Sequence, residues 1–222
     1  MERKIIISKD GSHTIQIPEL NVTYHSIHGA IQESKHVFIK EGLHHVISHS
    51  TFNPISIFEM GFGTGLNAFL TAIEAEEKNI QVRYTAVDQF PIIPEEASKL
   101  NYVESLGHEK IFKHLHSSNW NEAFSITDRF ILRKEHTDLI QFSTAQQFNL
   151  IYYDAFAPAA QPELWTKEVF EKLYNKLCSN GVLVTYCSKG DVRRAMIAAG
   201  FIVTKLPGPP GKREMLRAVK SN

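Results

Sequence analysis

Apolar positions along this chain follow two alternating patterns from residue 55 onward. Short apolar runs predict strands at residues 55–59, 81–88, 130–133, 150–154, 182–187, 201–205 and 214–219. Apolar residues recur at helical spacing at 66–77, 95–106, 162–177 and 189–199. Strands separated by helices predict an α/β fold with a mostly parallel, seven-stranded sheet and right-handed crossovers. The last two strands are joined by a Pro/Gly-rich loop at 207–211 and are expected to pair antiparallel.

The first 50 residues have a different pattern. Asp10-Gly11 lies between two apolar runs, 4–8 and 13–17, and predicts a small N-terminal β-hairpin. Residues 20–47 are mixed, and we expect an ordered lead-in with one helix that ends near Gly42. The predicted organisation is a lead-in at 1–50 followed by a main domain at 51–222.

Composition limits the class of protein. The chain has 222 residues, with 24 basic and 24 acidic residues and a formal net charge of zero. The net charge therefore does not indicate a protein whose whole surface binds a polyanion. Its two cysteines have no metal-ligand spacing and are expected to be reduced thiols. The N-terminal apolar run is too short for a signal peptide, and no stretch is long enough for a membrane span. These features predict a cytoplasmic protein.

The most informative segment follows the first strand of the main domain. Glu59 is followed by three alternating glycines, Gly61, Gly63 and Gly65, at the predicted start of a helix. Glycines allow positive φ angles and close approach of a ligand to the backbone. A dinucleotide fingerprint has the spacing GxGxxG, whereas this segment has ExGxGxG. An anion beside the glycines disfavours a pyrophosphate and suits a cationic or zwitterionic ligand.

Acidic residues recur at or near the ends of the predicted parallel strands, where ligands bind in open α/β sheets. Glu59 ends the first strand, and Asp88 ends the second, where an acid can accept hydrogen bonds from ribose hydroxyls. Asp138 follows the third strand and is a candidate for an adenine amino group, while Asp154 ends the fourth. Single acids are common in turns, but four in this order indicate a ligand site.

Several later segments identify a family. The chain contains Asp154-Ala-Phe-Ala-Pro158, Pro162-Glu-Leu-Trp-Thr166 and Gly211-Lys-Arg-Glu-Met215 in addition to the glycine segment Gly61-Phe-Gly-Thr-Gly-Leu-Asn67. Together they resemble the methyltransferase domain of the bifunctional tRNA 5-methylaminomethyl-2-thiouridine biosynthesis proteins. The resemblance covers about residues 24–217. It implies the Rossmann-like fold of class I methyltransferases and S-adenosyl-L-methionine as cofactor.

The resemblance also implies an activity and a set of cofactor contacts. The family methylates the amine of 5-aminomethyluridine at the wobble position of tRNA. Its bifunctional members also carry an FAD-dependent domain that produces this amine, and we expect that half to be absent here, with another enzyme supplying the substrate. The expected cofactor contacts are Tyr24, Ser26, Glu59, Gly61, Phe62, Gly63, Thr64, Gly65, Asn67, Asp88, Asp138 and Asp154.

Asp154 is the candidate catalytic residue. A primary alkylamine is mostly protonated near neutral pH, and the protonated form has no lone pair with which to attack a methyl group. Asp154 can orient the amine, or accept its proton directly or through water. An anion beside an ammonium group also favours the charged form, so orientation is the preferred role and general base the second.

The expected partner is the anticodon loop of tRNA, whose unpaired bases can be splayed and stacked on aromatic side chains. Phe156, Trp165 and Phe62 are candidates for the base pocket, with core packing as the alternative for each. The candidates for tRNA contact in the C-terminal half are Lys189, Arg193, Lys212, Arg213 and Glu214, and a solvated surface is their alternative.

Other interpretations are weaker. The eleven histidines include the pairs His44-His45 and His114/His116, but neither has carboxylate or cysteine partners at metal-ligand spacing, so no metal is predicted. No GxSxG nucleophile elbow indicates a hydrolase. Three alternatives stay open: a methyltransferase acting on a small-molecule amine or another RNA, a catalytically silent binding module, and, last, a dinucleotide oxidoreductase.

Overall fold

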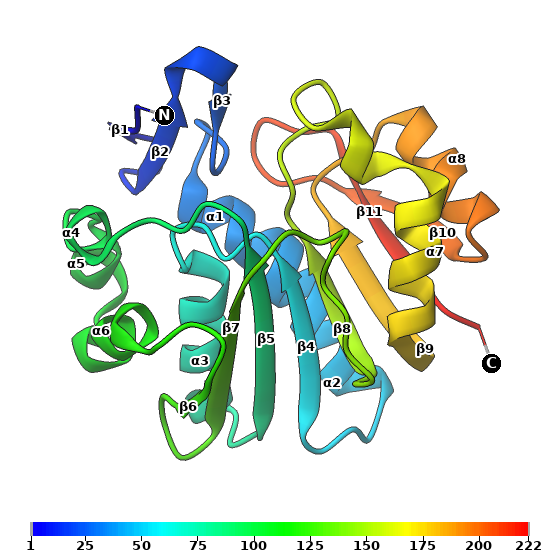
Figure 1. Ribbon diagram of the computed structural model, residues 1–222, viewed down its shortest axis with the longest axis horizontal. Helices are drawn as coiled ribbons and strands as arrows, with labels where there is room; N and C mark the ends of the chain where they lie inside the picture. The colour runs from blue at the N-terminus through cyan, green and yellow to red at the C-terminus, as the bar shows by residue number, and fades with distance from the viewer. Residues whose placement is uncertain (1, 222) are drawn as a thin grey trace.

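The computed structural model of the protein describes residues 2–221, which contain a large sheet and a small one (Figure 1). The large sheet has eight strands in the order β10-β11-β9-β8-β4-β5-β7-β6. Their bounds are β4 Ile55–Met60, β5 Val82–Asp88, β6 Ala123–Ser125, β7 Phe130–His136, β8 Phe148–Tyr153, β9 Leu177–Thr185, β10 Ile202–Pro207 and β11 Glu214–Val219.

The predicted mostly parallel sheet with an antiparallel end is confirmed. Strands β9, β8, β4, β5 and β7 run parallel to one another, and β11 pairs antiparallel with both β9 and β10. The sheet has eight strands rather than seven, because the three-residue strand β6 adds an antiparallel edge beside β7. A strand this short leaves little periodicity in the sequence.

Helices cover both faces of this sheet and enclose two apolar cores. Adjacent residues of β4 point to opposite sides: Ile57 packs with α3 (Leu66–Glu77), and Phe58 packs with α7 (Lys167–Lys176). The first face also carries α6 (Glu109–Ser117) and the helical run α1 (Ala30–Ser34), η2 (Lys35–His44) and α2 (His45–His49). The second face carries α7 and α8 (Gly190–Ala198) (Figure 1).

Two predicted helices differ from the structure. The helix expected at 95–106 is divided into α4 (Pro94–Ala97) and α5 (Tyr102–Leu106). Between them, the Asn101 side chain accepts a hydrogen bond from the His13 N–H at 2.7 Å and donates to the Gly11 carbonyl at 2.9 Å. The helix expected at 162–177 begins with a 3₁₀ turn, η3 (Pro162–Trp165), and α7 follows from a Thr166 cap.

The prediction that the lead-in helix ends near Gly42 is wrong. Helical structure continues through Gly42 to His49. A Cβ atom at Gly42 would lie 3.0 Å from Val184 and 3.2 Å from Tyr152, so this glycine allows the helix to approach the sheet closely. The helical part of the lead-in therefore shares its core with the large sheet, and a boundary near residue 50 remains a proposal based on the change of sequence pattern.

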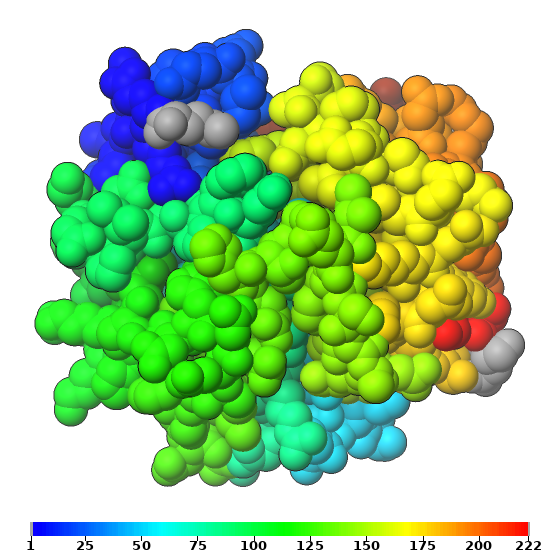
Figure 2. All heavy atoms as spheres, viewed as in Figure 1, coloured from blue at the N-terminus to red at the C-terminus, as the bar shows by residue number. Residues whose placement is uncertain are grey.

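The predicted N-terminal hairpin is confirmed and forms part of a three-stranded sheet. Strand β1 (Lys4–Ile7) pairs antiparallel with β2 (His13–Ile17), and β2 pairs with β3 (Val22–Thr23). Arg3 connects this sheet to the segment after β5, because its guanidinium donates to the Phe90 carbonyl at 2.5 Å and to Glu96 at 2.8 Å. Figure 2 shows the N-terminal segment in contact with that part of the surface.

The sheet also places the site. The chain forms β4, β5 and β7 toward one edge and then returns to form β8 beside β4 and β9 beyond it. The strand order therefore reverses between β4 and β8, and ligands of open α/β sheets bind at the carboxyl ends of strands at such a point. Met60 and Tyr153 are paired there, so the glycine turn after β4 lies next to Asp154 after β8.

Candidate functional site

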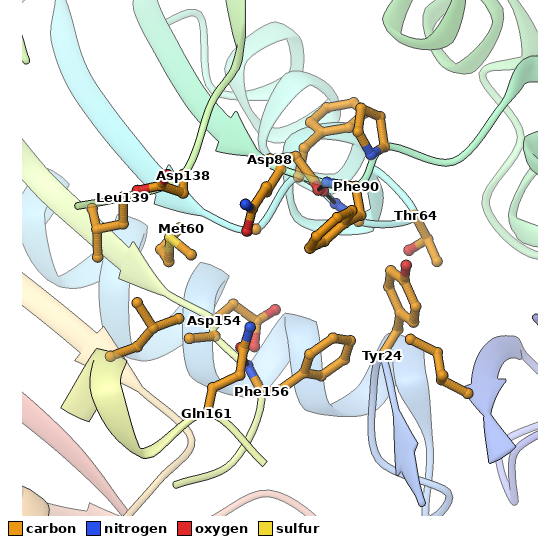
Figure 3. Close-up of a pocket in the computed structure, with 18 of the residues that line it drawn as sticks. Tyr24, Met60, Thr64, Asp88, Phe90, Asp138, Leu139, Asp154, Phe156 and Gln161 are labelled. Carbon is orange, nitrogen blue, oxygen red and sulfur yellow. Dashed lines mark hydrogen bonds between the residues drawn. The ribbon is translucent and has the colours of Figure 1, made fainter. Parts of the chain in front are cut away.

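A cavity of about 790 Å³ opens at the carboxyl ends of β4, β5, β7 and β8. Ten of the predicted cofactor or substrate residues line it: Tyr24, Gly61, Phe62, Gly63, Thr64, Asn67, Asp88, Asp138, Asp154 and Phe156. In Figure 3 the side chains of Tyr24, Asp88, Phe90, Asp154 and Phe156 surround one common space. Residues from five separate parts of the chain thus form a single pocket.

The glycine-rich turn forms the floor of this cavity. Gly61, Gly63 and Gly65 all have positive φ angles, of 88°, 53° and 72°. A Cβ atom at Gly63 would lie 3.0 Å from the Tyr24 ring, and one at Gly65 would lie 3.0 Å from His116. The alternating glycines are therefore required by both backbone conformation and close packing. Gly65 itself lies behind the turn rather than on the cavity wall.

Asp88 holds the turn from the neighbouring strand. It is the last residue of β5, and its Oδ2 accepts the Gly63 N–H at 2.8 Å while its Oδ1 accepts the Phe90 N–H at 2.8 Å. These two donors favour the charged carboxylate, but burial has the larger effect and raises the Asp88 pKa above its ordinary value. Each carboxylate oxygen keeps a second lone pair for a ligand hydroxyl.

Asp154, Asn67 and Glu59 form a hydrogen-bonded group below and beside the cavity. Asn67, in the first turn of α3, donates from Nδ2 to Asp154 at 2.9 Å and to Glu59 at 3.0 Å. Glu59 is fully buried and does not line the cavity, which differs from the direct ligand contact expected from the sequence. Glu59 Oε2 and Asn67 Oδ1 are both buried without a hydrogen-bond partner.

Burial changes the proton affinity of both carboxylates. Burial, followed by the charge of Glu33, raises the pKa of Asp154 to about 7, against opposing contributions from Asn67 and Lys212. The pKa of Glu59 is also raised, mainly by burial and in part by Asp154. A carboxylate with a pKa near neutrality can exchange a proton with a ligand at physiological pH.

Aromatic side chains form the wall next to Asp154. Phe156 contacts Tyr24 edge-to-face, with ring centroids 5.3 Å apart, and Phe62 is buried against Trp120 and His116. The expectation that Trp165 lines the pocket is wrong, because Trp165 packs in the core against Tyr153 with ring centroids 5.0 Å apart. Trp165 instead donates from Nε1 to the Phe156 carbonyl at 2.8 Å and so holds Phe156 in place.

The lead-in supplies a wall that the sequence predicted only in part. Tyr24 lines the cavity, but Ser26 does not. The Ser26 N–H donates to Glu33, and its Oγ accepts the His28 N–H at 3.1 Å. The lining residues that the sequence did not indicate include Arg3, Leu20, His25, Phe90, Ile140 and Gln161. Phe90 follows Asp88 by two residues, so its place near the end of a strand could have been inferred from the sequence. No local pattern around Arg3 indicates that it lines the cavity.

The predicted tRNA-contacting residues lie outside the cavity and do not form one group of free charges. Lys189 and Arg213 are exposed, and Arg193 is partly buried in α8. Lys212 forms an ion pair with the buried Glu33, and Glu214 pairs with Lys205 at 2.8 Å. A common phosphate-binding surface formed by all five residues is therefore not seen, and Lys189, Arg193 and Arg213 remain its candidates.

The charges around the cavity fit a cationic ligand. Its charged lining residues are the acids Asp88, Asp138, Asp154 and Glu163 and the single cation Arg3. Arg3 already donates to Glu96 and to backbone carbonyls. Together with the space left by the glycine turn, these acids suit a sulfonium and ammonium group joined to a nucleoside.

Within residues 2–221, no group of three or more His, Cys, Asp or Glu side chains is arranged to hold a metal ion. None of the helices in this part of the chain has the length and apolar character needed to cross a membrane.

Comparison with known proteins relates the chain to methyltransferases and to proteins named for a tRNA modification. A family model described as S-adenosyl-L-methionine-dependent methyltransferase matches residues 113–221. A tRNA 5-methylaminomethyl-2-thiouridine biosynthesis bifunctional protein MnmC from Leptospira borgpetersenii is 30% identical over 212 residues, which are 90% of this chain and 32% of that protein. The equivalent protein of Ectopseudomonas mendocina is 29% identical over 87% of this chain and 31% of its own length.

The resemblance derived from the sequence motifs is thus confirmed, and the chain spans about a third of the length of the curated relatives that it matches. Among solved structures, MNMC2 from Aquifex aeolicus superposes with a TM-score of 0.75 at 24% identity, covering 98% of this chain and 70% of that one. Spermidine synthase from Thermotoga maritima has a TM-score of 0.54 at 15% identity, covering 98% and 72%. These two similarities establish the fold.

Proposed function

We propose that this chain uses S-adenosyl-L-methionine to methylate the amine of 5-aminomethyluridine, or its 2-thio form, at the wobble position of tRNA. The product is 5-methylaminomethyl(-2-thio)uridine. The observation that carries the proposal is the position of Asp154, which lies at the β4/β8 switch point beside the glycine turn and beside Phe156. Relatives named for this tRNA modification that match 90% of the chain supply the substrate class.

Each part of the cavity has a role in this proposal. Asp88 receives the ribose hydroxyls, Asp138 lies where an adenine amino group can donate, and the turn at Gly61–Gly65 accommodates the amino acid part. Glu59 acts through Asn67, because it is buried below the cavity and hydrogen-bonds to Asn67 rather than facing the ligand. Phe156 and Tyr24 form an aromatic wall against which the target base stacks.

When bound, S-adenosyl-L-methionine would supply an electrophilic methyl group on a positively charged sulfur, and transfer to the amine would break an S–C bond and form an N–C bond. The protein aligns the amine and excludes water. Asp154 accepts a hydrogen bond from the amine and orients its lone pair. With a pKa raised to about 7, Asp154 is also a stronger base than an ordinary aspartate toward the proton that the nitrogen must lose.

The test is methyl transfer from labelled S-adenosyl-L-methionine to two tRNA preparations, one carrying 5-aminomethyluridine and one lacking the aminomethyl group. We expect label only in the first, and digestion to nucleosides should place it in 5-methylaminomethyl(-2-thio)uridine. Label in neither preparation, with cofactor binding intact, would contradict the substrate assignment. Label in a small amine but not in tRNA would favour the alternative of a small-molecule N-methyltransferase.

A further inference from the structure

Lys212 is directed into the molecule rather than toward a nucleic acid. Its Nζ forms an ion pair with Glu33 of α1, whose side chain is only 6% exposed, and lies 3.9 Å from the centroid of the Tyr186 ring. Both interactions stabilise a cation in a partly desolvated position. Because this lysine already has an acidic and an aromatic partner, the segment that contains it can have a role within the protein.

The Glu33–Lys212 pair joins the helical lead-in to the 207–213 loop. Glu33 Oε1 also accepts the N–H of Ser26, two residues after the cavity-lining Tyr24, at 2.9 Å. The loop at 207–213 is further held by His36, which hydrogen-bonds the Pro207 carbonyl at 2.8 Å, and by Gly211, at which a Cβ atom would overlap His28. The ion pair is thus accompanied by further contacts between this loop and the lead-in.

Tyr186 extends this connection to Asp154. The Tyr186 hydroxyl donates to the carbonyl of Ala155 at 2.9 Å, directly after Asp154, while Lys212 covers its ring. Hydrogen bonds, an ion pair and a cation–π contact therefore link Ser26, Glu33, Lys212 and Tyr186 to the backbone that carries Asp154.

We propose that Glu33 and Lys212 are positioning residues for the methyl transfer, which hold the 207–213 loop against the lead-in and set the electrostatic field at the Asp154 carboxylate. The inference rests on the proposed function for its role in catalysis. Its electrostatic part concerns Asp154 alone and can be measured without any substrate.

The two charges act on Asp154 in opposite directions. Glu33 raises the Asp154 pKa, and Lys212 lowers it. The other groups that face Asp154 are Glu59 through Asn67, and the neutral phenols of Tyr84 on β5 and Tyr186 after β9. Of these groups, only Glu33 and Lys212 form an ion pair. A substitution of either residue therefore removes one of the two opposing effects on the Asp154 pKa.

The experiment follows the carboxyl carbon of Asp154 by ¹³C NMR across a pH titration, with the signal assigned by its loss in Asp154→Asn. We expect the Asp154 titration midpoint to rise in Lys212→Met and to fall in Glu33→Gln, each by on the order of one pH unit. Lys205→Met is the matched control, because it removes the same charge from the exposed pair with Glu214 and should leave the midpoint unchanged.

The opposite signs separate an electrostatic role from a structural one. If the pair only held the loop in place, both substitutions would admit water and lower the Asp154 titration midpoint. This result would overturn the proposal. Lys212→Arg keeps the charge and should restore the wild-type midpoint. If Lys212→Met does not fold, the downward shift in Glu33→Gln and its return in Glu33→Asp decide the question.

The catalytic part is tested by the pH profile of kcat for the same variants with tRNA. The acid limb should move in the direction of each Asp154 midpoint, while the Kd for S-adenosylhomocysteine at pH 8 changes less than threefold. If the wild-type protein methylates no tRNA but the midpoints move as expected, the proposed substrate fails and the electrostatic inference stands. An active wild-type protein with unmoved midpoints in the variants would overturn the electrostatic inference and leave the proposed function intact.

Discussion

Asn67 donates a hydrogen bond to Asp154 at 2.9 Å from an amide group whose own oxygen has no partner. The same nitrogen donates to Glu59 on the other side, at 3.0 Å. One amide therefore separates two carboxyl groups that would otherwise face each other in a buried space. The amide therefore holds the Asp154 carboxylate in place at the cavity wall.

Asn67→Ala should therefore reduce both stability and cofactor affinity. Two buried carboxyl groups lose their shared donor, which should lower the free energy of unfolding by about 1–3 kcal/mol. Asn149→Ala is the control, since Asn149 accepts the Ser56 N–H at 2.7 Å at the opposite end of the sheet. Urea unfolding should show a loss in both variants, and calorimetry with S-adenosyl-L-methionine should show weaker binding only in Asn67→Ala. Equal affinities in the two variants would contradict the ligand role of Asn67.

Gly63→Ala should abolish cofactor binding. The residue has φ of 53° and its Cβ would lie 3.0 Å from the Tyr24 ring, so alanine is strained and also displaces the wall of the cavity. Gly107→Ala provides the matched comparison, because it has φ of 72° but no atom within 4 Å of its Cβ. We expect Gly107→Ala to cost about 1–3 kcal/mol through backbone strain alone, because φ of 72° with ψ of −150° is essentially restricted to glycine, and to bind the cofactor normally. Normal binding by Gly63→Ala would remove the turn from the proposed site.

The stability of the ligand-free protein should fall as pH rises through the range in which Asp154 titrates. Its pKa is raised from the ordinary 3.8 to about 7, so between these values the folded state holds a proton that the unfolded chain has released. The unfolded state then binds fewer protons, and stability decreases with pH by at most about 1.4 kcal/mol for each unit. Urea unfolding of wild type and Asp154→Asn from pH 4 to 8 isolates this slope as the difference between the two proteins. A constant difference would show that Asp154 titrates at its ordinary pKa.

Binding of S-adenosyl-L-methionine should show the opposite pH dependence. A cationic ligand favours the charged carboxylate, so below about pH 7 binding must release the Asp154 proton. The affinity should therefore rise by up to about tenfold for each pH unit and level off above pH 7. Calorimetry should show a weaker dependence in Asp154→Asn. An equally steep dependence in that variant would assign the proton to another group.

Trp165→Phe should affect the acceptor side of the site selectively. The substitution keeps the aromatic packing against Tyr153 but removes the hydrogen bond from Nε1 to the Phe156 carbonyl. The unpaired carbonyl should cost about 1 kcal/mol of stability. Steady-state kinetics should show a higher KM for tRNA with little change in the Kd of the cofactor. A change confined to the cofactor would place Phe156 outside the base pocket.

Sequence patterns predicted the sheet and the glycine turn because both are determined locally. The run before Glu59 is apolar except for Ser56, as in a strand buried on both faces, and the turn requires glycine because its backbone has positive φ angles. Asp88 and Asp154 were found because the fold brings the carboxyl ends of parallel strands to one edge.

Features that depend on distant contacts could not be predicted in the same way. Gly42 resembles a helix terminus in the sequence, yet its role depends on Val184 and Tyr152, more than a hundred residues away. Lys212 resembles a phosphate ligand until Glu33 is placed beside it. Trp165 fits a base pocket and a core equally well, and only its contacts with Tyr153 and Phe156 decide between them.

The wall supplied by the N-terminal sheet has a consequence for how the protein matures during synthesis. Arg3, Tyr24 and Asp154 line the same cavity, although more than 150 residues separate the first from the last. A nascent chain therefore cannot hold the cofactor tightly until its central strand β8 has emerged and the early sheet has docked. Cofactor capture would then act as a late checkpoint, and protection of β1–β3 amides from hydrogen exchange would report that the whole molecule is assembled.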